Sequence, residues 1–369
     1  MRRMKILIFA NDDEGLFQFR KELLLELTKT NEVYASVPEG PYQKELEEIG
    51  VKLLTTNFNR RGINPFSDLS LLKKYVKLLK EIKPSIALTY TIKPNVYGGL
   101  ACQKAKIPYI ANITGLGTAV ETGGLLSKIS LMLYKKGLKK ADMVFFQNEE
   151  NQAFMLKKKA VKGQYDLLPG SGVNTKFFQP IDYPSGDVIH FSFISRIMKE
   201  KGIDQYLNAA KIIRAKYPNT CFHVCGYCEG DYQKTLEELT KSGVIVYHGR
   251  VRDVREIHKI SWCTVHPTYY PEGLSNVLLE SLACCRPIIA TNRSGCKEII
   301  DDEVNGFIVK QKDTDDLIKQ LRRFIEMPLE GKKAMGINGR KKVEERFDRS
   351  VVVQKYLAAI EIIVGGAGR

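Results

Sequence analysis

The stretch Pro271–Ala283 reads PEGLSNVLLESLA and follows the short apolar run CTVHP at Cys263–Pro267. The run predicts a buried strand, and the apolar spacing of VLLESLA predicts a helix beginning around Gly273. Glycine lets a ligand approach the backbone, and the amides of Leu274, Ser275 and Asn276 at the helix N-terminus would form a phosphate cradle. A strand, polar loop and helix in this order indicate an α/β domain with its site beyond the carboxyl end of the strand.

Two glutamates in this stretch are candidates for contact with a ligand. Glu272 and Glu280 are separated by about two helical turns, so both could reach one molecule at the helix N-terminus. The alternative is that Glu272 only stabilises the helix N-terminus and Glu280 is a solvated helix residue.

The same alternation of strand and helix runs along the whole chain. In the first half, amphipathic segments at Leu16–Leu27, Leu69–Leu79 and Leu126–Leu138 separate short apolar runs. The runs are strand candidates at Lys5–Asn11, Glu32–Val37, Val51–Thr55, Ser85–Thr91, Tyr109–Thr114 and Met143–Gln147. Runs such as ILIFA are apolar on both faces, as in a parallel strand covered by helices on both sides. This rhythm predicts a doubly wound parallel sheet.

A break in the rhythm divides the chain. Leu167–Gly186 concentrates Pro, Gly, Ser and Asn and is the predicted linker. After it come further strand candidates at Val188–Ser195, Cys221–Gly226, Val244–His248, Cys263–Pro267 and Pro287–Thr291. Helices are expected at Ile203–Lys216, Tyr232–Leu239, Leu274–Ala283 and Thr314–Ile325. We therefore expect two Rossmann-like domains, residues 1–178 and 187–346, facing across a cleft, with a C-terminal helical segment, residues 347–369, that could pack on either domain.

A second polar loop follows the first strand of the second half. SRIMKEKGI at Ser195–Ile203 places Arg196 and Lys201 on either side of a strand-to-helix turn. Two cations there could neutralise a diphosphate in both the ground and the transition state. Lysine-rich loops of this kind are also common without any ligand, but this loop and the Glu272 loop converge on one edge of one sheet.

These motifs occur in an order that is similar to a known family. Arg196, Lys201 and Gly202 are followed by Glu272-Gly273 and Glu280, then Pro287–Thr291 with Gly295, then Asn305–Val309. Together they resemble the donor domain of the retaining family 4 glycosyltransferases of GT-B fold. The resemblance implies that Arg196 and Lys201 bind the donor diphosphate, that Glu280 binds the ribose and that Glu272 contacts the transferred sugar. It also implies that the Gly273–Ser275 amides cradle the phosphate, and that Arg250 and Val251 face the base.

The first half resembles the branch of this family that acts on polyprenyl-diphosphate-linked saccharides. Asp12–Gly15 is similar to a loop that covers donor phosphates, with Gly15 as its one glycine. The segments Thr89–Gly99 and Asn112–Glu121 are similar to acceptor-side segments, in which Lys93, Asn95, Thr114, Gly115 and Gly117 would line the acceptor. Many members carry a histidine in this half, whereas here all five histidines follow residue 180.

The charge is concentrated in one third of the chain. Residues 51–180 hold 21 Lys and Arg against 7 Asp and Glu, so they carry +14 of the net +15. Such a field suits an anionic partner. Within Leu125–Lys140, Lys128, Lys135, Lys136 and Lys139 could contact an anionic membrane or a lipid diphosphate. The alternative is an ordinary sheet-covering helix with a solvated lysine face.

Other patterns exclude or weaken competing functions. Cys221, Cys225 and Cys228 lack a second ligand pair at zinc spacing and are interpreted as core thiols. Asp313 and Asp315 open a predicted helix as capping residues. There is no GxGxxG after the first strand, so no dinucleotide cofactor is expected, and the family resemblance implies no metal. No recognition helix or stacking platform for nucleic acid is visible.

The sequence therefore predicts a peripheral retaining glycosyltransferase at the cytoplasmic face of the cell membrane. It would transfer a hexose or N-acetylhexosamine from a UDP-sugar to a polyprenyl-diphosphate-linked saccharide. A glycosyltransferase with a soluble acceptor is the first alternative, and a basic nucleic-acid-binding protein is the second.

Overall fold

The computed structural model describes residues 3–59, 64–117, 120 and 123–366. The chain forms two compact units, and each is described by itself. Unit 1 comprises Met1–Gly172, Glu272–Leu274 and Arg349–Arg369, and unit 2 comprises Val173–Pro271 and Ser275–Asp348. The chain thus passes from unit 1 to unit 2 within the predicted linker, after Gly172, returns briefly to unit 1 at Glu272–Leu274, and returns again at Arg349.

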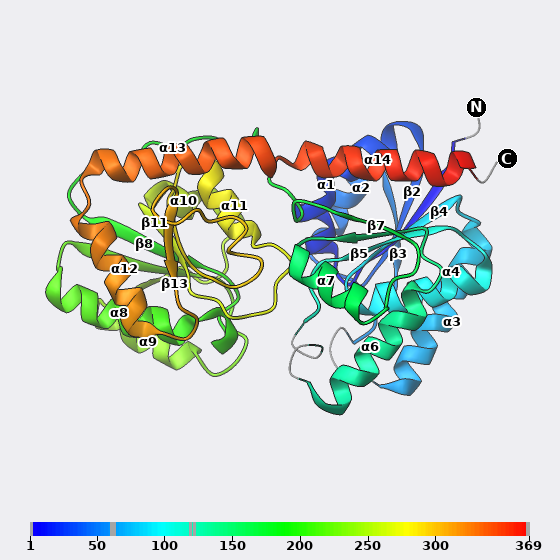
Figure 1. Ribbon diagram of the computed structural model, residues 1–369, viewed down its shortest axis with the longest axis horizontal. Coiled ribbons are helices and arrows are strands. Elements are labelled where there is room, and N and C mark those ends of the chain that lie inside the picture. Colours follow the sequence, from blue (N-terminus) through cyan, green and yellow to red (C-terminus); the bar gives the residue numbers. More distant parts are fainter. Residues whose placement is uncertain (1–2, 60–63, 118–119, 121–122, 367–369) are drawn as a thin grey trace. The chain divides into compact units, whose positions relative to one another are not determined.

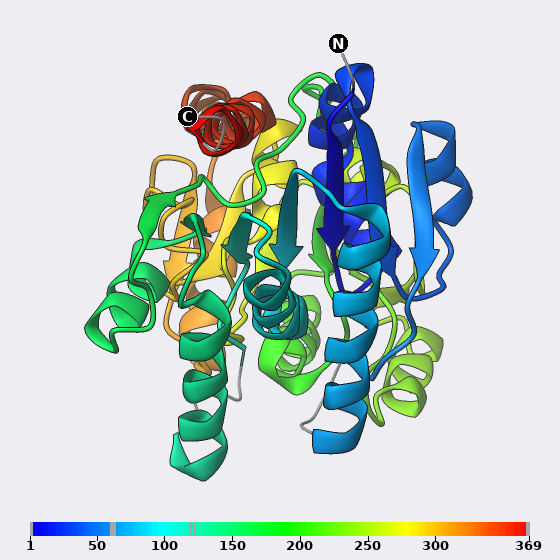
Figure 2. The ribbon, with the colours of Figure 1, turned by 90° about the vertical axis from the view of Figure 1, so that its right-hand side faces the viewer.

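Unit 1 is built on a seven-stranded parallel sheet with the order β3-β2-β1-β4-β5-β6-β7 (Figures 1 and 2). The order reverses between β1 and β4, which makes the carboxyl ends of these two strands the switch point of the sheet. Its strands are β1 (Lys5–Phe9), β2 (Glu32–Val37), β3 (Val51–Thr55), β4 (Ile86–Tyr90), β5 (Tyr109–Ile113), β6 (Met143–Phe146) and β7 (Gln164–Leu167). Its helices are α1 (Asp13–Thr30), α2 (Gln43–Glu48), α3 (Pro65–Ile82), the π-helical turn η1 (Pro94–Gly98), α4 (Gly99–Ala105), α6 (Gly124–Leu138), α7 (Glu149–Lys157) and α14 (Arg349–Gly366).

The side chains of β1 show why this sheet must be covered on both faces. Ile6 and Ile8 belong to one buried cluster, with residues of α1, α2 and α14. Leu7 and Phe9 belong to another, with residues of α3, α4, α6 and α7. A strand that is apolar at every position can be buried only between two helical layers.

The C-terminal helix α14 belongs to the first of these layers. Tyr356 is fully buried and its hydroxyl accepts a hydrogen bond from Asn112 Nδ2 at 2.6 Å. At the start of the helix, Arg349 pairs with Glu22 at 2.8 Å and donates to the Gly172 carbonyl. The last 18-residue helix therefore completes the core of unit 1.

Unit 2 repeats the architecture with a six-stranded parallel sheet in the order β10-β9-β8-β11-β12-β13. Phe191, Phe193 and Phe222 pack against α8 and α12 on one face, and Ile194 and Cys225 contact α10 and α11 on the other. The strands are β8 (Ile189–Ile194), β9 (Thr220–Cys225), β10 (Val246–Tyr247), β11 (Cys263–His266), β12 (Ile288–Thr291) and β13 (Gly306–Val309). The helices are η2 (Lys199–Lys201), α8 (Ile203–Lys216), α9 (Gln233–Lys241), α10 (Arg255–Ile260), α11 (Asn276–Ala283), α12 (Thr314–Glu326) and α13 (Leu329–Arg346).

A buried arginine attaches the second half of the linker to unit 2. The Arg286 side chain is fully buried and donates to the carbonyls of His258, Ile181 and Asp182 at 2.9, 2.7 and 2.6 Å. Its guanidinium lies 4.8 Å from the centre of the Tyr183 ring. Three carbonyl acceptors offset the cost of burying this charge and fix the course of residues 181–183.

The edge strands β7 and β13 were not predicted from the sequence. The four-residue β7, QYDL, is half exposed and mixes polar with apolar residues, and β13 begins at a glycine. Edge strands carry weak periodicity because one side has no partner strand. Among the described residues, no helix combines the length and the apolar content needed to span a bilayer.

The buried ring of His258 makes the stability of unit 2 depend on pH. The side chain is fully buried, and burial together with the nearby Arg286 charge lowers the pKa of His258 to about 3. The unfolded imidazole has a pKa near 6.5, so its stabilising contribution is complete above that pH and decreases as the pH falls toward 3.

We expect acidification from pH 7 to pH 5 to cost unit 2 about 2 kcal/mol through this group. Urea unfolding of the wild type and of His258→Leu at both pH values measures the effect. The variant should lose about 2 kcal/mol less on acidification. Equal losses in the two proteins would contradict the assignment.

Candidate functional site

In unit 2, the loop after β8 brings two cations together over one aromatic ring. The Arg196 guanidinium carbon lies 5.2 Å and the Lys201 Nζ 5.0 Å from the centre of the Tyr270 ring. Arg196 also donates to both carboxylate oxygens of Glu229 at 3.1 Å. Burial works against the charged guanidinium, but Glu229 and Tyr270 outweigh it, so the pKa of Arg196 is raised. The loop holds its positive charges beyond the carboxyl end of β8, as the sequence predicted.

Gly202 is the residue that makes this loop possible. Its φ of 79° lies in the left-handed region, and a side-chain carbon at this position would overlap the Pro267 carbonyl oxygen, directly after β11. Only glycine permits both the backbone conformation and the close approach. The motif R-x4-K-G therefore reflects contact between the loops that follow β8 and β11.

The loop after β11 differs from the sequence prediction in one important detail. Helix α11 begins at Asn276 with Ser275 as its N-cap, not around Gly273. The Ser275 amide donates to the Gly295 carbonyl at 2.8 Å, so it is not available for the predicted phosphate cradle. The cause is tertiary, because Gly295 belongs to the loop after β12, about 20 residues further along the chain.

The side chains at the start of α11 leave hydrogen-bonding capacity unused. Ser275 Oγ and Asn276 Oδ1 are buried oxygens that have no hydrogen-bond partner among the described residues. Buried polar atoms without partners are uncommon in folded proteins and often mark a ligand position. Glu280 lies one helical turn beyond Asn276 and is partly exposed. The N-terminal end of α11 is thus suited to accept hydrogen-bond donors from a bound molecule.

The loop after β12 is held by a network of its own. Glu298 accepts from Ser294 Oγ at 3.0 Å and from the Gly295 amide at 2.7 Å. Gly295 has a φ of 91°, which explains the glycine in the motif. On the other side of the sheet edge, Val251 packs with Ile194 and Ile257, and Arg250 lies 5.9 Å from the Tyr227 ring.

The segment Glu272–Leu274 belongs to unit 1 by its contacts. Asn148 Nδ2 donates to the Gly273 carbonyl at 2.5 Å and to the Glu272 carbonyl at 3.1 Å. A side-chain carbon at Gly273 would overlap the Thr114 carbonyl and the Gln147 amide oxygen. The glycine is therefore required by backbone packing, and the adjacent Glu272 is fixed at its main chain. Gly15 also belongs to unit 1, and the donor-side candidates outside this segment otherwise lie in unit 2.

Two residues predicted to line the acceptor, Lys93 and Asn95, take part in buried polar networks. Lys93 pairs with Asp68 at 2.7 Å, and Tyr97 donates to the same carboxylate at 2.9 Å. The Lys93 and Asp68 side chains are 9% and 5% exposed, so the pair is buried. Asn95 is fully buried, accepts from Thr89 Oγ1 at 2.7 Å and donates to the Asn112 carbonyl at 2.8 Å.

Three glycines predicted from the first half take different positions. The Gly15 amide donates to the N-cap residue Asp12 at 2.5 Å, so it closes the first turn of α1 and is not open to a phosphate. Gly115 and Gly117 follow β5 with φ of 147° and 73°, beside Thr114. Of the similar segment Asn112–Glu121, the residues Thr118, Ala119 and Glu121 lie outside the described part of the chain.

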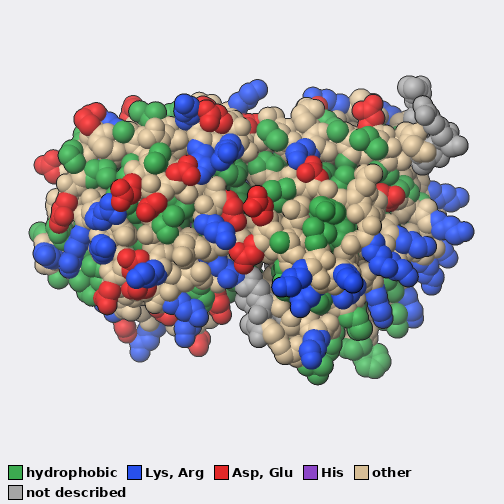
Figure 3. Space-filling view, viewed as in Figure 1, with side chains coloured by type: hydrophobic (Ala, Val, Ile, Leu, Met, Phe, Trp, Pro, Cys, Tyr) green, Lys and Arg blue, Asp and Glu red, His purple; other side chains and the backbone are tan. Residues whose placement is uncertain are grey.

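The basic third of the chain forms a lysine-rich face with apolar tips. Lys128, Lys135, Lys136 and Lys139 are all exposed on or directly after α6. At the N-terminal ends of α3 and α6, Phe66 is 88% and Leu125 75% exposed, with Leu69 and Leu126 beside them in the sequence. Figure 2 shows both helices extending past the carboxyl ends of the strands of unit 1, and Figure 3 shows the basic side chains gathered around them. We call Phe66, Leu69, Leu125 and Leu126 the apolar tips.

Sequence reasoning missed three residues that organise the candidate site. The Tyr270 ring lies beneath the Arg196 and Lys201 side chains. Glu229 accepts hydrogen bonds from Arg196, and Asn148 donates to the carbonyls of the Glu272 segment. None of these residues belongs to a motif that the sequence analysis used. The doubled aromatic TYY before Pro271 was the one available signal for Tyr270.

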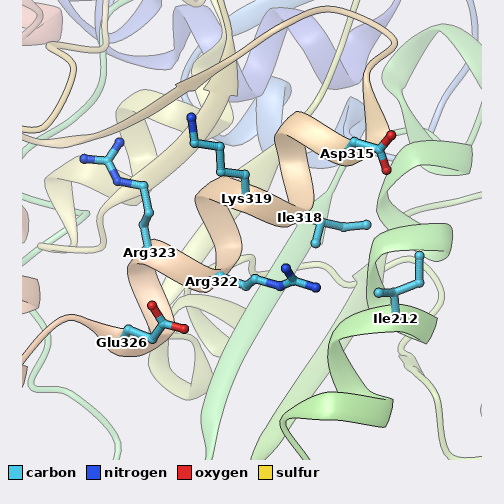
Figure 4. Close-up of a pocket in the computed structure, with 7 residues that line it drawn as sticks. All are labelled: Ile212, Asp315, Ile318, Lys319, Arg322, Arg323 and Glu326. Carbon is cyan, nitrogen blue, oxygen red and sulfur yellow. The ribbon is translucent and has the colours of Figure 1, made fainter.

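Other features are not part of the site. A hollow of ≈ 430 Å³ lies in unit 2 beside α8 and α12, where Arg322 and Ile318 point toward Ile212 while Lys319 and Arg323 point away (Figure 4). It lies on the helical layer and contains none of the candidate residues. Asp313 caps α12 by accepting from the Asp316 amide, as predicted, and the eight cysteines form no disulfide.

The fold and the paired cations define a class of protein with two Rossmann-like domains, one of which holds two cations beyond the carboxyl end of its first strand. Comparison with known families agrees. Residues 177–342 match the model of the glycosyl transferases group 1, and residues 5–148 match the glycosyl transferase 4-like model. The chain belongs to the glycosyltransferases of this family, with the GT-B fold.

Individual relatives are similar over most of their length. An N,N'-diacetylbacillosaminyl-diphospho-undecaprenol α-1,3-N-acetylgalactosaminyltransferase of Campylobacter jejuni is 26% identical, over 98% of this chain and 99% of the relative. An Escherichia coli α-1,3-galactosyltransferase, whose name gives UDP-Gal and GlcNAc-diphosphoundecaprenol, is 23% identical over 72% of this chain and 73% of the relative. The crystal structure of Anabaena HepE with UDP superimposes with a TM-score of 0.78 at 17% identity, over 97% of this chain and all of that one.

The paired cations can be tested by nucleotide binding. We expect Lys201→Ala to weaken UDP binding by about 10- to 100-fold, because a charge-assisted hydrogen bond contributes about 1.5–3 kcal/mol. Isothermal titration calorimetry measures the affinity. Lys199→Ala is the matched control, since Lys199 is exposed two residues away. Equal affinities for UDP in the two variants would contradict a role for Lys201 in diphosphate binding.

Proposed function

We propose that this glycosyltransferase transfers a hexose or N-acetylhexosamine from a UDP-sugar to a polyprenyl-diphosphate-linked saccharide. The observation that carries the donor half is the pair Arg196 and Lys201 over one tyrosine ring beyond the end of β8. Two fixed cations favour a diphosphate leaving group, whose charge grows as the sugar departs. The acceptor half is supported by the two relatives whose names give undecaprenyl-diphosphate-linked acceptors.

The expected stereochemical course is retention. In a UDP-hexose such as UDP-Gal the sugar is α-linked, and both relatives are named for α-1,3 products. In a front-face reaction, the bond between C1 and the donor phosphate oxygen breaks as the bond to the acceptor oxygen forms. The departing phosphate oxygen takes the acceptor proton, so no protein base is needed. This agrees with the position of all five histidines after residue 180.

Six donor-side candidates have a part in this proposal. Arg196 and Lys201 stabilise the UDP product, Glu280 accepts from the ribose hydroxyls, and Glu272 steadies positive charge at the anomeric carbon. The amides of Leu274 and Asn276 remain as donors for the phosphate, because the Ser275 amide already donates to the Gly295 carbonyl. The charge of the two cations replaces a divalent metal, so we expect activity in the presence of EDTA.

The transfer reaction tests the proposal as a whole. A panel of UDP-hexoses and UDP-N-acetylhexosamines is offered with polyprenyl-diphosphate-linked GlcNAc, GalNAc or diacetylbacillosamine. We expect one donor to give an α-linked glycolipid. Glu272→Ala should lower the rate at least about 100-fold, since groups that stabilise transition-state charge contribute about 3 kcal/mol or more. Glu238→Ala, at an exposed position of α9, is the control.

The failures of this assay are distinguishable. Binding of UDP without transfer to any lipid-linked acceptor would overturn the acceptor half and favour a soluble acceptor. Absence of UDP binding would overturn the donor half. A β-linked product would overturn retention.

We also propose that unit 1 binds the inner face of the cell membrane through the lysine-rich face and the apolar tips. Exposed Phe66 and Leu125 suit the interfacial region of a bilayer, and the lysines around them suit anionic headgroups. The alternative of an ordinary solvated helix explains the lysines but not the exposed aromatic and leucine side chains at the tips.

Vesicle sedimentation checks this proposal. Replacing Lys128, Lys135, Lys136 and Lys139 by serine should weaken binding to anionic vesicles by at least about 100-fold, at about 1 kcal/mol for each lysine. Phe66→Ser with Leu125→Ser should weaken binding to both anionic and neutral vesicles. Serine at the exposed Lys157, Lys158 and Lys159, at the end of α7 and directly after it, is the control. Vesicle binding that is unaffected by the first set would rule the face out.

A further inference from the structure

Three histidines form a row that crosses the unit 2 sheet from the start of β8 to the end of β10. His190 lies on β8, His223 lies on β9, and His248 directly follows β10. His190 Nδ1 is 2.8 Å from His223 Nε2, and His223 Nδ1 is 2.9 Å from His248 Nε2. The neighbouring rings are 5.1 Å apart, centre to centre. Nothing in the proposed transfer reaction uses this row.

A cysteine stands beside the first two histidines. Cys221 lies on β9 in register with His190, and it shares a sheet face with His223 because alternate strand residues point the same way. One atom from each of His190, Cys221 and His223 can be chosen so that all three lie within 4.8 Å of one another. Among the described residues, this is the group of three or more His, Cys, Asp or Glu side chains with that geometry.

We infer that His190, Cys221 and His223 form a binding site for a zinc ion. Two imidazole nitrogens and one sulfur are the ligands that Zn²⁺ prefers, with water as the fourth. In a tetrahedral site the two nitrogens would stand about 3.3 Å apart, given Zn–N bonds of about 2.0 Å. The present 2.8 Å separation of His190 Nδ1 and His223 Nε2 needs to open only by about half an ångström.

His248 supplies the outer partner that such sites require. A histidine that ligates through one nitrogen commonly donates its other N–H to a fixed acceptor, which sets the tautomer and the ring orientation. His223 would ligate through Nε2 and donate from Nδ1 to His248 Nε2, at the observed 2.9 Å. The row is therefore already arranged with two ligands and one orienting residue.

The surroundings allow an ion to enter. His223 is only 5% exposed, whereas His190 and Cys221 are partly exposed, so the site is open on one side. It lies at the start of β8, and Arg196 follows the end of the same six-residue strand. A metal here would join β8 to β9 through residues that are not donor-side candidates. The inference is therefore independent of the proposed function.

The test uses the full-length protein without a histidine tag, after removal of metal with a chelator. Titration with Zn²⁺ against a chromophoric chelator should show one ion bound per chain. Co²⁺ as a spectroscopic probe should give the near-ultraviolet absorption of a cobalt–thiolate bond. Cys221→Ser should abolish that absorption, and His223→Gln should abolish stoichiometric binding. Cys228→Ser, in the same unit but outside the group, is the matched control.

His248→Gln separates an orienting residue from a ligand. We expect it to keep the cobalt–thiolate absorption and to weaken Zn²⁺ binding by about 10- to 100-fold. A variant that fails to fold does not prevent the test, because alkylation of the wild type measures the same contact. Zn²⁺ should protect Cys221, and not Cys228, from iodoacetamide in peptide mapping. No stoichiometric binding, or no protection of Cys221, would overturn the inference and leave the row as a hydrogen-bonded ladder.

Discussion

The donor-side loops of unit 2 depend on one close approach of backbone to backbone, between Gly202 and the Pro267 carbonyl. Because no side chain stands between them, the loop after β8 lies against the loop after β11, and Arg196 and Lys201 reach the Tyr270 ring. A residue with a β-carbon would push the loops apart and strain a φ of 79°. The placement of positive charge is thus a consequence of packing at the carboxyl edge of the sheet, and the chemistry follows from that placement.

In unit 1, residues of a family motif contribute to the packing of the fold. Asn95 and Lys93 stand in a segment similar to acceptor-binding segments, but both are buried with their polar groups satisfied inside the protein. Removing Asp68 or Lys93 would leave an unpaired charge in the core, a change that commonly costs about 3–5 kcal/mol. These residues hold the π-helical turn η1 against β4 and β5.

Two groups of polar side chains in unit 2 have different surroundings. At the start of α11, the Ser275 Oγ and Asn276 Oδ1 oxygens have no hydrogen-bond partner among the described residues. The histidine row is connected by its own hydrogen bonds and crosses the sheet from His190, at the start of β8, to His248, directly after β10. The proposed zinc ligands His190, Cys221 and His223 are not donor-side candidates. Metal and nucleotide are therefore proposed to bind through different residues.

The sequence by itself determined the architecture, the linker region, the family and the charged loop at Arg196 and Lys201, because periodicity, glycine and proline positions and motif order are local signals. It could not determine which amides stay free: Ser275 is engaged by Gly295 from another loop. Nor could it place Tyr270 beside the two cations or Asn148 beside Glu272. It could not align His190, His223 and His248 either, because strand register brings these three residues together. Such contacts join residues about 20–120 positions apart, and their partners are chosen by the folded sheet, not by neighbouring sequence.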